Sequence, residues 1–338
     1  MKLTFPVLFL VHSLRAETVG WDTDNYVKAF RYYLDPDKAS KAEDWEAFFR
    51  FLYGSLTRVT EDPQWILVVC AAIILTGYAI FIYYNTDEGC SVFWPVFFYL
   101  TLTHYFSSMN ILRQCCAMAF SLNIITVLRR DRSQRGFLIA ALLLVLSTMF
   151  HSTAVIGAVY FVPFIPKKTG RGMVGLVFLF TLIGYFSFSK LLLWLFQVFP
   201  KYAHYEESKY FAEAGIGPYY TIQMLLKIFL IFMVLFLNPD DENNTDTYRL
   251  TVLVAVSVGI TLLKSETNLA ARLSFFFDLF NILAIPMAVN RLCEGKVRTL
   301  VYHGLFALGV FMLFYNMTGS SKGCVPYEFF WQISGGVT

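Results

Sequence analysis

Long apolar segments recur along the chain, and they constrain its fold more than any other feature of the sequence. A helix needs about 20 apolar residues to cross roughly 30 Å of hydrocarbon. Segments with that character lie at 65–84, 172–198, 219–237, 250–266, 273–289 and 299–315. Charged residues make up only 15% of the chain, whereas a soluble domain carries roughly 25%. The sequence therefore predicts an all-α, polytopic integral membrane protein.

The charges of the loops predict how these helices are oriented. Shorter apolar stretches lie at 92–107, 115–128, 137–150 and 152–165. Clusters of Lys and Arg lie in the loops 129–135, 167–171 and 291–298, and they share one side of the membrane if every stretch crosses it. Because cytoplasmic loops are enriched in Lys and Arg, we expect about 10 crossings with these clusters in the cytoplasm. Residues 1–14 add one more crossing if they form a short first helix rather than a cleaved signal peptide.

The remaining loops are then expected to be external. They are 15–64, 108–114, 199–218, 267–272 and 316–338. The longest, 15–64, contains apolar residues that recur at helical spacing: Trp45, Phe48, Phe49, Leu52 and Leu56. This spacing predicts an amphipathic helix, which either lies on the membrane surface or packs over the ends of other helices.

Two segments, 92–128 and 137–165, are predicted to form short helical hairpins. A hairpin keeps the basic clusters on either side of 137–165 together in the cytoplasm. Each arm of that hairpin would be only about 21 Å long at roughly 1.5 Å per residue, too short to reach the outer surface of a bilayer. Two neighbouring short hairpins predict an outward-facing cavity in a single transmembrane domain that comprises residues 1–338.

Polar residues at the two hairpin tips are the first candidates for a functional site. The first tip carries Asn110, Arg113 and Gln114, and the second carries His151. Ionisable groups inside a membrane are costly and usually face a protein interior or a water-filled cavity. We therefore expect Arg113 and His151 near the floor of the cavity. Cations in that place suit an anionic lipid headgroup, above all a diphosphate.

Four further basic residues are expected at a similar depth: Lys190, Lys227, Lys264 and Arg272. Each of them either lines the cavity, connects two helices or extends its charge to the membrane surface. The apolar surroundings of Lys190 and Lys227 favour the last two roles. The polar sequence SETNLAAR favours a role in the site for Arg272.

The first external loop begins with a pair of carboxylates in Gly20-Trp21-Asp22-Thr23-Asp24. A carboxylate beside a sugar hydroxyl can act as a general base or simply bind the hydroxyl. Turn formation alone also favours Gly and Asp. Spacing alone leaves these interpretations open.

Taken in order, these motifs resemble a known family. They are Arg15, Val19, Gly20, Asp22, Thr23 and Tyr26; then Asn110, Arg113 and Gln114; then His151, Ser152 and Ala154; then Arg272; and last Val325-Pro326-Tyr327 with Phe329 and Phe330. Their order resembles the EpsG-type family of exopolysaccharide polymerases, which are Wzy-like membrane proteins. The resemblance spans nearly the whole chain. A Glu-Pro-Gly-like element of that family corresponds only loosely, to Glu43-Asp44-Trp45.

The resemblance implies a glycosyltransferase in the bacterial cytoplasmic membrane, with its active site outside. Its substrate would be an oligosaccharide repeat unit on undecaprenyl diphosphate, and one such unit would transfer its growing chain to the non-reducing end of another. Membrane lipid would be a further partner. Arg113 and Arg272 would stabilise the leaving diphosphate. His151 or Asp22 would accept the proton of the acceptor hydroxyl, and we favour His151 as the base with Asp22 as a sugar ligand. The resemblance adds further substrate-binding residues: Arg15, Asp24, Tyr26, Asn110 and Gln114.

Partners and competing functions follow from the same observations. The six cysteines show no metal-ligand spacing, so we expect no metal or other cofactor. A net charge of +3 gives no footprint for nucleic acid, whereas a flippase and a chain-length regulator are expected partner proteins. One alternative is a ligase that transfers a finished glycan to another acceptor. Another is a transporter or flippase of the lipid-linked glycan, for which discontinuous helices and repeated halves would be typical.

Overall fold

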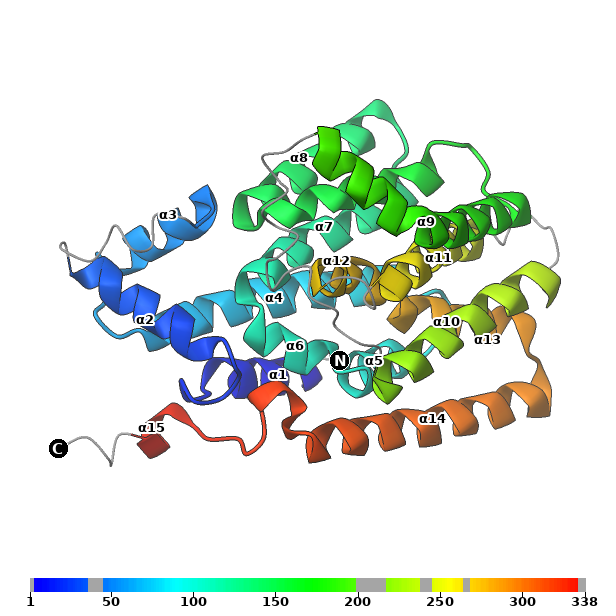
Figure 1. Cartoon of the computed structure of the whole chain (residues 1–338). Coiled ribbons are helices and arrows are strands. Elements are labelled where there is room, and N and C mark those ends of the chain that lie inside the picture. Colours follow the sequence, from blue (N-terminus) through cyan, green and yellow to red (C-terminus); the bar gives the residue numbers. More distant parts are fainter. Residues whose placement is uncertain (1–2, 36–44, 199–216, 238–244, 264–267, 334–338) are drawn as a thin grey trace. The chain divides into compact units, whose positions relative to one another are not determined.

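The computed structural model describes residues 3–35, 45–198, 217–237, 245–263 and 268–333, and within these ranges every regular element is a helix (Figure 1). The helical segments long and apolar enough to cross a membrane are Gln64–Asn85, Pro218–Leu237, Arg272–Leu292 and Gly295–Thr318. Shorter apolar helices cover Thr4–Ser13, Gln134–Phe150, Ser152–Phe164 and Arg171–Ser187. The predicted all-α, polytopic membrane protein is confirmed. The number and direction of the crossings stay predictions.

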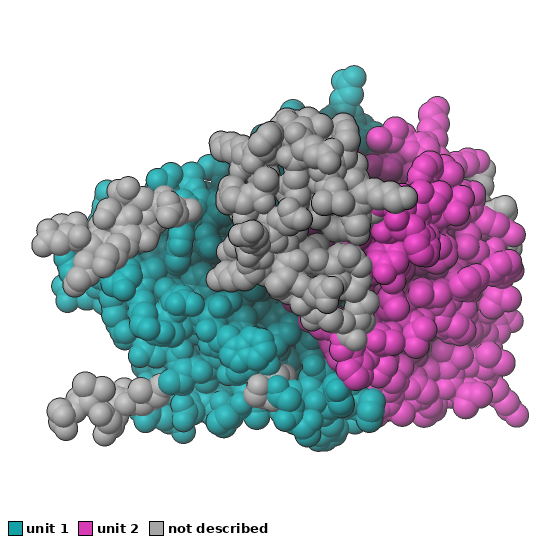
Figure 2. Space-filling model, in the orientation of Figure 1, with its two compact units in different colours: residues 1–85, 96–158, 309–338 teal, residues 86–95, 159–308 magenta. Residues whose placement is uncertain are grey.

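The chain folds into two compact units, which Figure 2 draws in separate colours. Unit 1 comprises residues 1–85, 96–158 and 309–338, and unit 2 comprises residues 86–95 and 159–308. Unit 1 contains α1 (Thr4–Ser13), α2 (Thr23–Leu34), α3 (Ala47–Leu56), α4 (Gln64–Asn85), α6 (His104–Asn110), α7 (Leu112–Arg130), α8 (Gln134–Phe150), η6 (Ser320–Gly323) and α15 (Phe330–Ile333). Unit 2 contains α9 (Arg171–Val198), α10 (Pro218–Leu237), α11 (Thr245–Leu262), α12 (Asn268–Asp278) and α13 (Asn281–Leu292). Both units share α5 (Phe93–Thr101), η2 (Ser152–Phe164) and α14 (Gly295–Thr318).

Small residues and backbone-directed hydroxyls bring α4, α7 and α8 together in unit 1. A Cβ atom at Gly77 on α4 would lie 2.5 Å from the Ala119 Cβ on α7, so glycine is what permits this close approach. The Ser147 hydroxyl on α8 donates to the Ala117 carbonyl on α7 at 2.7 Å. Small residues and interhelical hydrogen bonds are the usual means of helix association where lipid removes the hydrophobic driving force.

The helices break at the two predicted hairpin tips. Ile111 separates α6 from α7 and has φ −89° and ψ 58°, which lies outside the helical region. His151 has φ −158° and ψ 122°, so its extended backbone ends α8 before η2 begins. A new helix begins directly after each break, and the first backbone N–H groups of a helix have no partner within that helix. These N–H groups are available to bind other atoms.

The amphipathic helix predicted in the first external loop is α3, and it packs on α2. Its buried residues are Phe49 and Tyr53. The ring of Tyr53 lies 6.0 Å from that of Phe30 on α2, and its hydroxyl donates to the Tyr26 carbonyl at 3.0 Å. The helix begins at Ala47, whereas the predicted spacing of apolar residues begins at Trp45. Residues 36–44, which include Glu43 and Asp44, lie outside the described part of the chain.

Residues 15–20, in the first predicted external loop, contact residues 323–329 of the C-terminal segment. The Gly20 N–H donates to the Gly323 carbonyl at 2.8 Å, and the Ala16 N–H donates to the Glu328 carbonyl at 2.9 Å. Arg15 and Phe329 form an isolated antiparallel bridge. Gly20 and Gly323 have φ angles of 96° and 76°, a left-handed conformation that glycine adopts without steric cost. The first and last motifs of the resemblance are thus in direct contact.

A buried ion pair connects three helices of unit 2. Lys227 Nζ on α10 lies 2.5 Å from Asp278 Oδ1 at the end of α12, and both side chains are buried. The ammonium group also donates to Ser257 Oγ at 2.8 Å and to Thr261 Oγ1 at 3.0 Å, both on α11. Lys227 therefore connects helices, as its apolar surroundings favour. The Lys190 side chain and residue Lys264 lie outside the described part of the structure.

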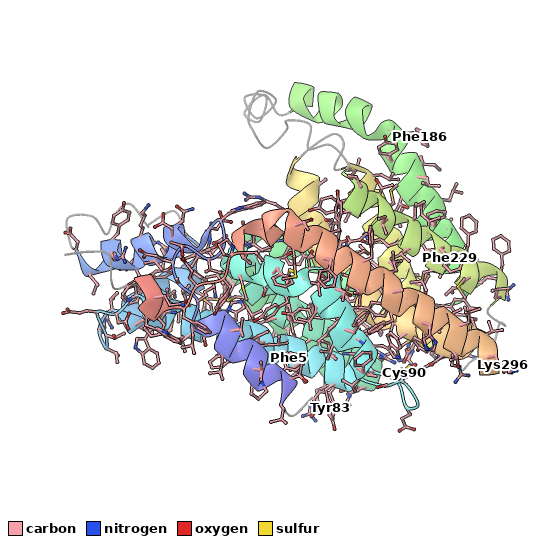
Figure 3. The ribbon with its side chains drawn as sticks, turned by 90° about the horizontal axis from the view of Figure 1, so that it is seen from below. Phe5, Tyr83, Cys90, Phe186, Phe229 and Lys296 are labelled. Atoms are coloured by element: carbon pink, nitrogen blue, oxygen red, sulfur yellow. The ribbon has the colours of Figure 1, made fainter. Side chains whose placement is uncertain are left out.

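Large aromatic side chains project from the helices of unit 2. Figure 3 shows Phe186 on α9 and Phe229 on α10 pointing away from the ribbon, and their exposed fractions are 78% and 60%. Exposed aromatic residues on apolar helices suit contact with lipid rather than water.

The predicted orientation can be tested by cysteine labelling. Arg132→Cys, in a chain whose six free cysteines have been replaced, lies in an exposed loop between α7 and α8. Because basic loops stay in the cytoplasm, a membrane-impermeant maleimide added outside should label it only after the membrane is permeabilised. Trp21→Cys in the first loop is the external control, since Trp21 is 69% exposed. Strong labelling of position 132 in intact cells would reverse the assignment.

Candidate functional site

One carboxylate, Glu46, joins the two tip residues that the sequence singled out. Its Oε2 accepts a hydrogen bond from Arg113 Nη1 at 2.8 Å, and its Oε1 lies 2.7 Å from His151 Nδ1. The Ser152 backbone N–H donates to the same Oε1 at 3.1 Å. Glu46 immediately precedes α3, Arg113 lies in the first turn of α7, and His151 follows α8. We call Glu46, Arg113 and His151 the Glu46 cluster.

Two aromatic residues hold the Arg113 end of the cluster. The guanidinium carbon lies 4.8 Å from the centre of the Trp45 ring, a distance at which a cation is attracted to the ring face. The Tyr26 ring meets that of Trp45 edge-on at 5.8 Å, and its hydroxyl interacts with the Arg113 backbone. Tyr26 is 8% exposed and packs against the cluster, whereas the resemblance implies that it is a substrate ligand.

The Glu46 carboxylate is strongly stabilised in its charged form. Burial alone would raise its pKa. The hydrogen bonds from His151 and from the backbone, together with the charge of Arg113, outweigh burial and lower the pKa to about 2. Because the pKa is lower in the folded protein, this carboxylate stabilises the fold above its ordinary pKa. The stabilisation is lost as the pH falls from that value toward 2.

The geometry fixes how the imidazole is protonated. An ionised carboxylate only accepts hydrogen bonds, so His151 Nδ1 must carry the proton that it shares with Glu46. In the neutral ring, Nε2 then has the lone pair and can accept a proton from another molecule. A buried carboxylate that orients a histidine and stabilises its protonated form is a recurrent arrangement in general-base catalysis. The His151 side chain is 13% exposed and that of Arg113 is 27% exposed, so external groups can reach both.

Three of the sequence candidates are buried inside unit 1. The Arg15 guanidinium is fully buried and donates to the Met109 carbonyl at 3.0 Å, with Nη1 also 2.9 Å from His12 Nδ1. The Asn110 amide donates to the Phe106 carbonyl at 3.1 Å, and Gln114 is also buried. In this structure all three residues are part of the interior of unit 1. Their role in binding substrate stays a prediction.

The two carboxylates of the first loop lie at the start of α2. Asp22 is half-buried at the N-cap position, one turn before Tyr26. Asp24 forms an ion pair with Lys28 at 2.5 Å, with both side chains largely exposed. Asp22 and Arg113 both lie near enough to Tyr26 to interact with it electrostatically. The roles of Asp22 and Asp24 toward sugars stay predictions.

Arg272 belongs to α12 in unit 2 and is exposed. Arg113 belongs to unit 1. A clamp in which these two residues hold one diphosphate stays a prediction.

Glu46 is the functional candidate that the sequence analysis missed. The resemblance pointed loosely to Glu43-Asp44-Trp45, three positions earlier than the carboxylate that meets Arg113 and His151. Its position just ahead of an amphipathic aromatic helix was the available signal.

The fold and the Glu46 cluster together define a class: a polytopic membrane protein in which a carboxylate-oriented histidine lies beside a cation suited to phosphate. The chain belongs to the EpsG family, which it matches over residues 1–329, and that family is linked to exopolysaccharide biosynthesis. Neither the curated proteins nor the solved structures contain a match to the chain. Among the described residues, no group of three or more His, Cys, Asp or Glu side chains is arranged to hold a metal ion.

Proposed function

We propose that this protein is a polysaccharide polymerase that joins oligosaccharide repeat units carried on undecaprenyl diphosphate. It acts at the external face of the bacterial cytoplasmic membrane. The single observation that supports the proposal is the Glu46 cluster, in which His151 and Arg113 contact one carboxylate. Membership of the EpsG family supports the class of product.

The acceptor step uses His151. A hydroxyl at the non-reducing end of one lipid-linked unit attacks the anomeric carbon of the growing chain on another. His151 Nε2 takes the hydroxyl proton as the new C–O bond forms, and Glu46 stabilises the resulting imidazolium through Nδ1–H. Asp22, in the first loop, is proposed to bind hydroxyls of the acceptor sugar.

The leaving step uses Arg113. The bond between the anomeric carbon and the diphosphate breaks, and the leaving lipid diphosphate takes the bonding electron pair. Arg113 engages Glu46 through Nη1, which leaves the other side of its planar fork to donate to phosphate oxygens. Arg272 is proposed as a second cation for the same diphosphate. A flippase that supplies the donor and a chain-length regulator are proposed partners.

The proposal is tested by purified protein and a defined lipid-linked repeat unit. Wild-type protein should produce a ladder of polymers, and Arg113→Lys should lower the rate roughly a hundredfold because a lysine keeps the charge but loses the planar fork. Arg31→Lys is the matched control, since Arg31 is an exposed residue that pairs with Glu17 on the same loop.

Three outcomes of this assay would contradict the proposal. A wild-type enzyme that transfers one finished glycan to a different acceptor is a ligase, and one that only moves the donor across the membrane is a transporter. Normal polymerisation by Arg113→Lys would remove Arg113 from the leaving-group site.

A further inference from the structure

A groove runs between α4, α7 and α8 on unit 1, with a volume of about 560 Å³. Its α4 wall is a stripe of exposed residues one helical turn apart: Ala72, Thr76 and Ile80. The lining also includes Phe120 and Asn123 of α7 and Leu143 of α8. Because α4 is long and apolar enough to span a membrane, this groove lies along a membrane-spanning segment.

Two of the polar residues that line the groove, Asn123 and Thr126, bind one another, Asn85 or the protein backbone. The Asn123 amide donates to the Ala119 carbonyl at 2.8 Å and to the Gly77 carbonyl at 3.0 Å. The Thr126 hydroxyl donates to Asn123 Oδ1 at 2.9 Å and accepts from the Asn85 amide at 2.8 Å. The walls therefore present hydrocarbon, and the groove suits an apolar occupant without polar requirements of its own.

Aromatic rings connect this groove to the Glu46 cluster. Phe120 stacks on Phe150 at 5.2 Å, and Phe150 in turn lies 4.4 Å from Phe48. Phe150 immediately precedes His151, and Phe48 follows Glu46 by two positions. Along α7, Phe120 lies about 10 Å from Arg113 at roughly 1.5 Å per residue. A continuous run of packed aromatic rings therefore leads from the groove to the cluster through Phe150, which is itself buried.

We propose that the groove holds the isoprenoid chain of the lipid-linked substrate whose diphosphate lies at Arg113. The inference rests on the proposed function and adds a second binding region to it. A bilayer lipid is as apolar as the isoprenoid, so hydrophobicity alone gives no preference between them. The isoprenoid has an advantage because its headgroup is already held, which raises its effective concentration in the groove.

Binding of undecaprenyl diphosphate and of dimethylallyl diphosphate to the purified full chain in nanodiscs provides the test. Both probes carry the same headgroup, and only the first has a chain long enough to follow α7 into the groove. In wild-type protein the long chain should bind about tenfold tighter than the short one. Thr76→Phe fills the groove from an exposed position and should bring the ratio of the two dissociation constants close to one, with dimethylallyl diphosphate unaffected.

Val145→Phe is the matched control, because it adds a ring at an exposed position of α8 outside the groove. It should keep the wild-type ratio, and Ala72→Phe should repeat the effect of Thr76→Phe. An equal ratio in wild-type and Thr76→Phe proteins would overturn the groove, as would a wild-type protein with no preference for the long chain. Turnover separates the two proposals: polymerisation with an unchanged ratio refutes the groove alone, and a groove-dependent ratio without polymerisation refutes the polymerase alone.

Discussion

His151→Ala should abolish polymerisation at every pH while the protein still binds undecaprenyl diphosphate. General-base catalysis contributes about 10²–10⁴-fold to a rate, and the cluster offers His151 as the group whose Nε2 can take the proton. The measurement is polymer yield from a defined lipid-linked repeat unit, with donor binding determined separately. Asp22→Asn should mainly weaken the use of the acceptor, as a rise in its KM.

Glu46→Gln separates the charge of the carboxylate from its role in orienting His151, in the same assay. The amide oxygen still accepts from Nδ1–H but carries no charge to stabilise an imidazolium, so kcat should fall about a hundredfold or more with little change in the KM of the donor. An unchanged kcat with a raised KM of the donor would overturn this role of Glu46.

An active His151→Ala enzyme beside an inactive Asp22→Asn enzyme would move the general base from His151 to the first external loop.

Lys227→Met should destabilise the protein by about 3–5 kcal/mol, because it leaves the Asp278 carboxylate buried without its cation. The expected result is a large loss of folded protein on thermal unfolding in detergent. The double variant Lys227→Met/Asp278→Leu should recover most of that loss, since replacing both members of a buried pair with apolar groups is often neutral.

Lys28→Met is the surface control for this pair. It removes an exposed ion pair with Asp24, which should leave the unfolding transition unchanged. A double variant as unstable as Lys227→Met would show that the network does more than neutralise Asp278. In that case the hydroxyls of Ser257 and Thr261 become the next groups to examine.

The sequence is most informative where one residue is out of place in its surroundings. Arg113 and His151 stand out as polar residues at the tips of apolar segments, and the structure brings both to one carboxylate. Glu46 does not stand out, because a carboxylate in a long external loop needs no special explanation. Its role depends on a contact across 105 positions with His151, and no local pattern encodes that distance.

The same contrast appears in unit 2. The apolar surroundings of Lys227 favour a contact between helices, but they do not predict which residue Lys227 contacts. Asp278 lies at the end of α12, in a segment that reads as one continuous span from 272 to 292. The break between α12 and α13 turns that carboxylate toward α10 and α11, and hydropathy alone gives no sign of the break.

The contact between residues 15–20 and residues 323–330 has a consequence for the order in which the protein matures. The backbone partners of Ala16 and Gly20 are synthesised about 300 residues after them. Until those partners leave the ribosome, the loop that carries Trp45 and Glu46 lacks one of its anchors. The early loop of the nascent chain therefore gains its full set of contacts only after the helices between the two segments have been made.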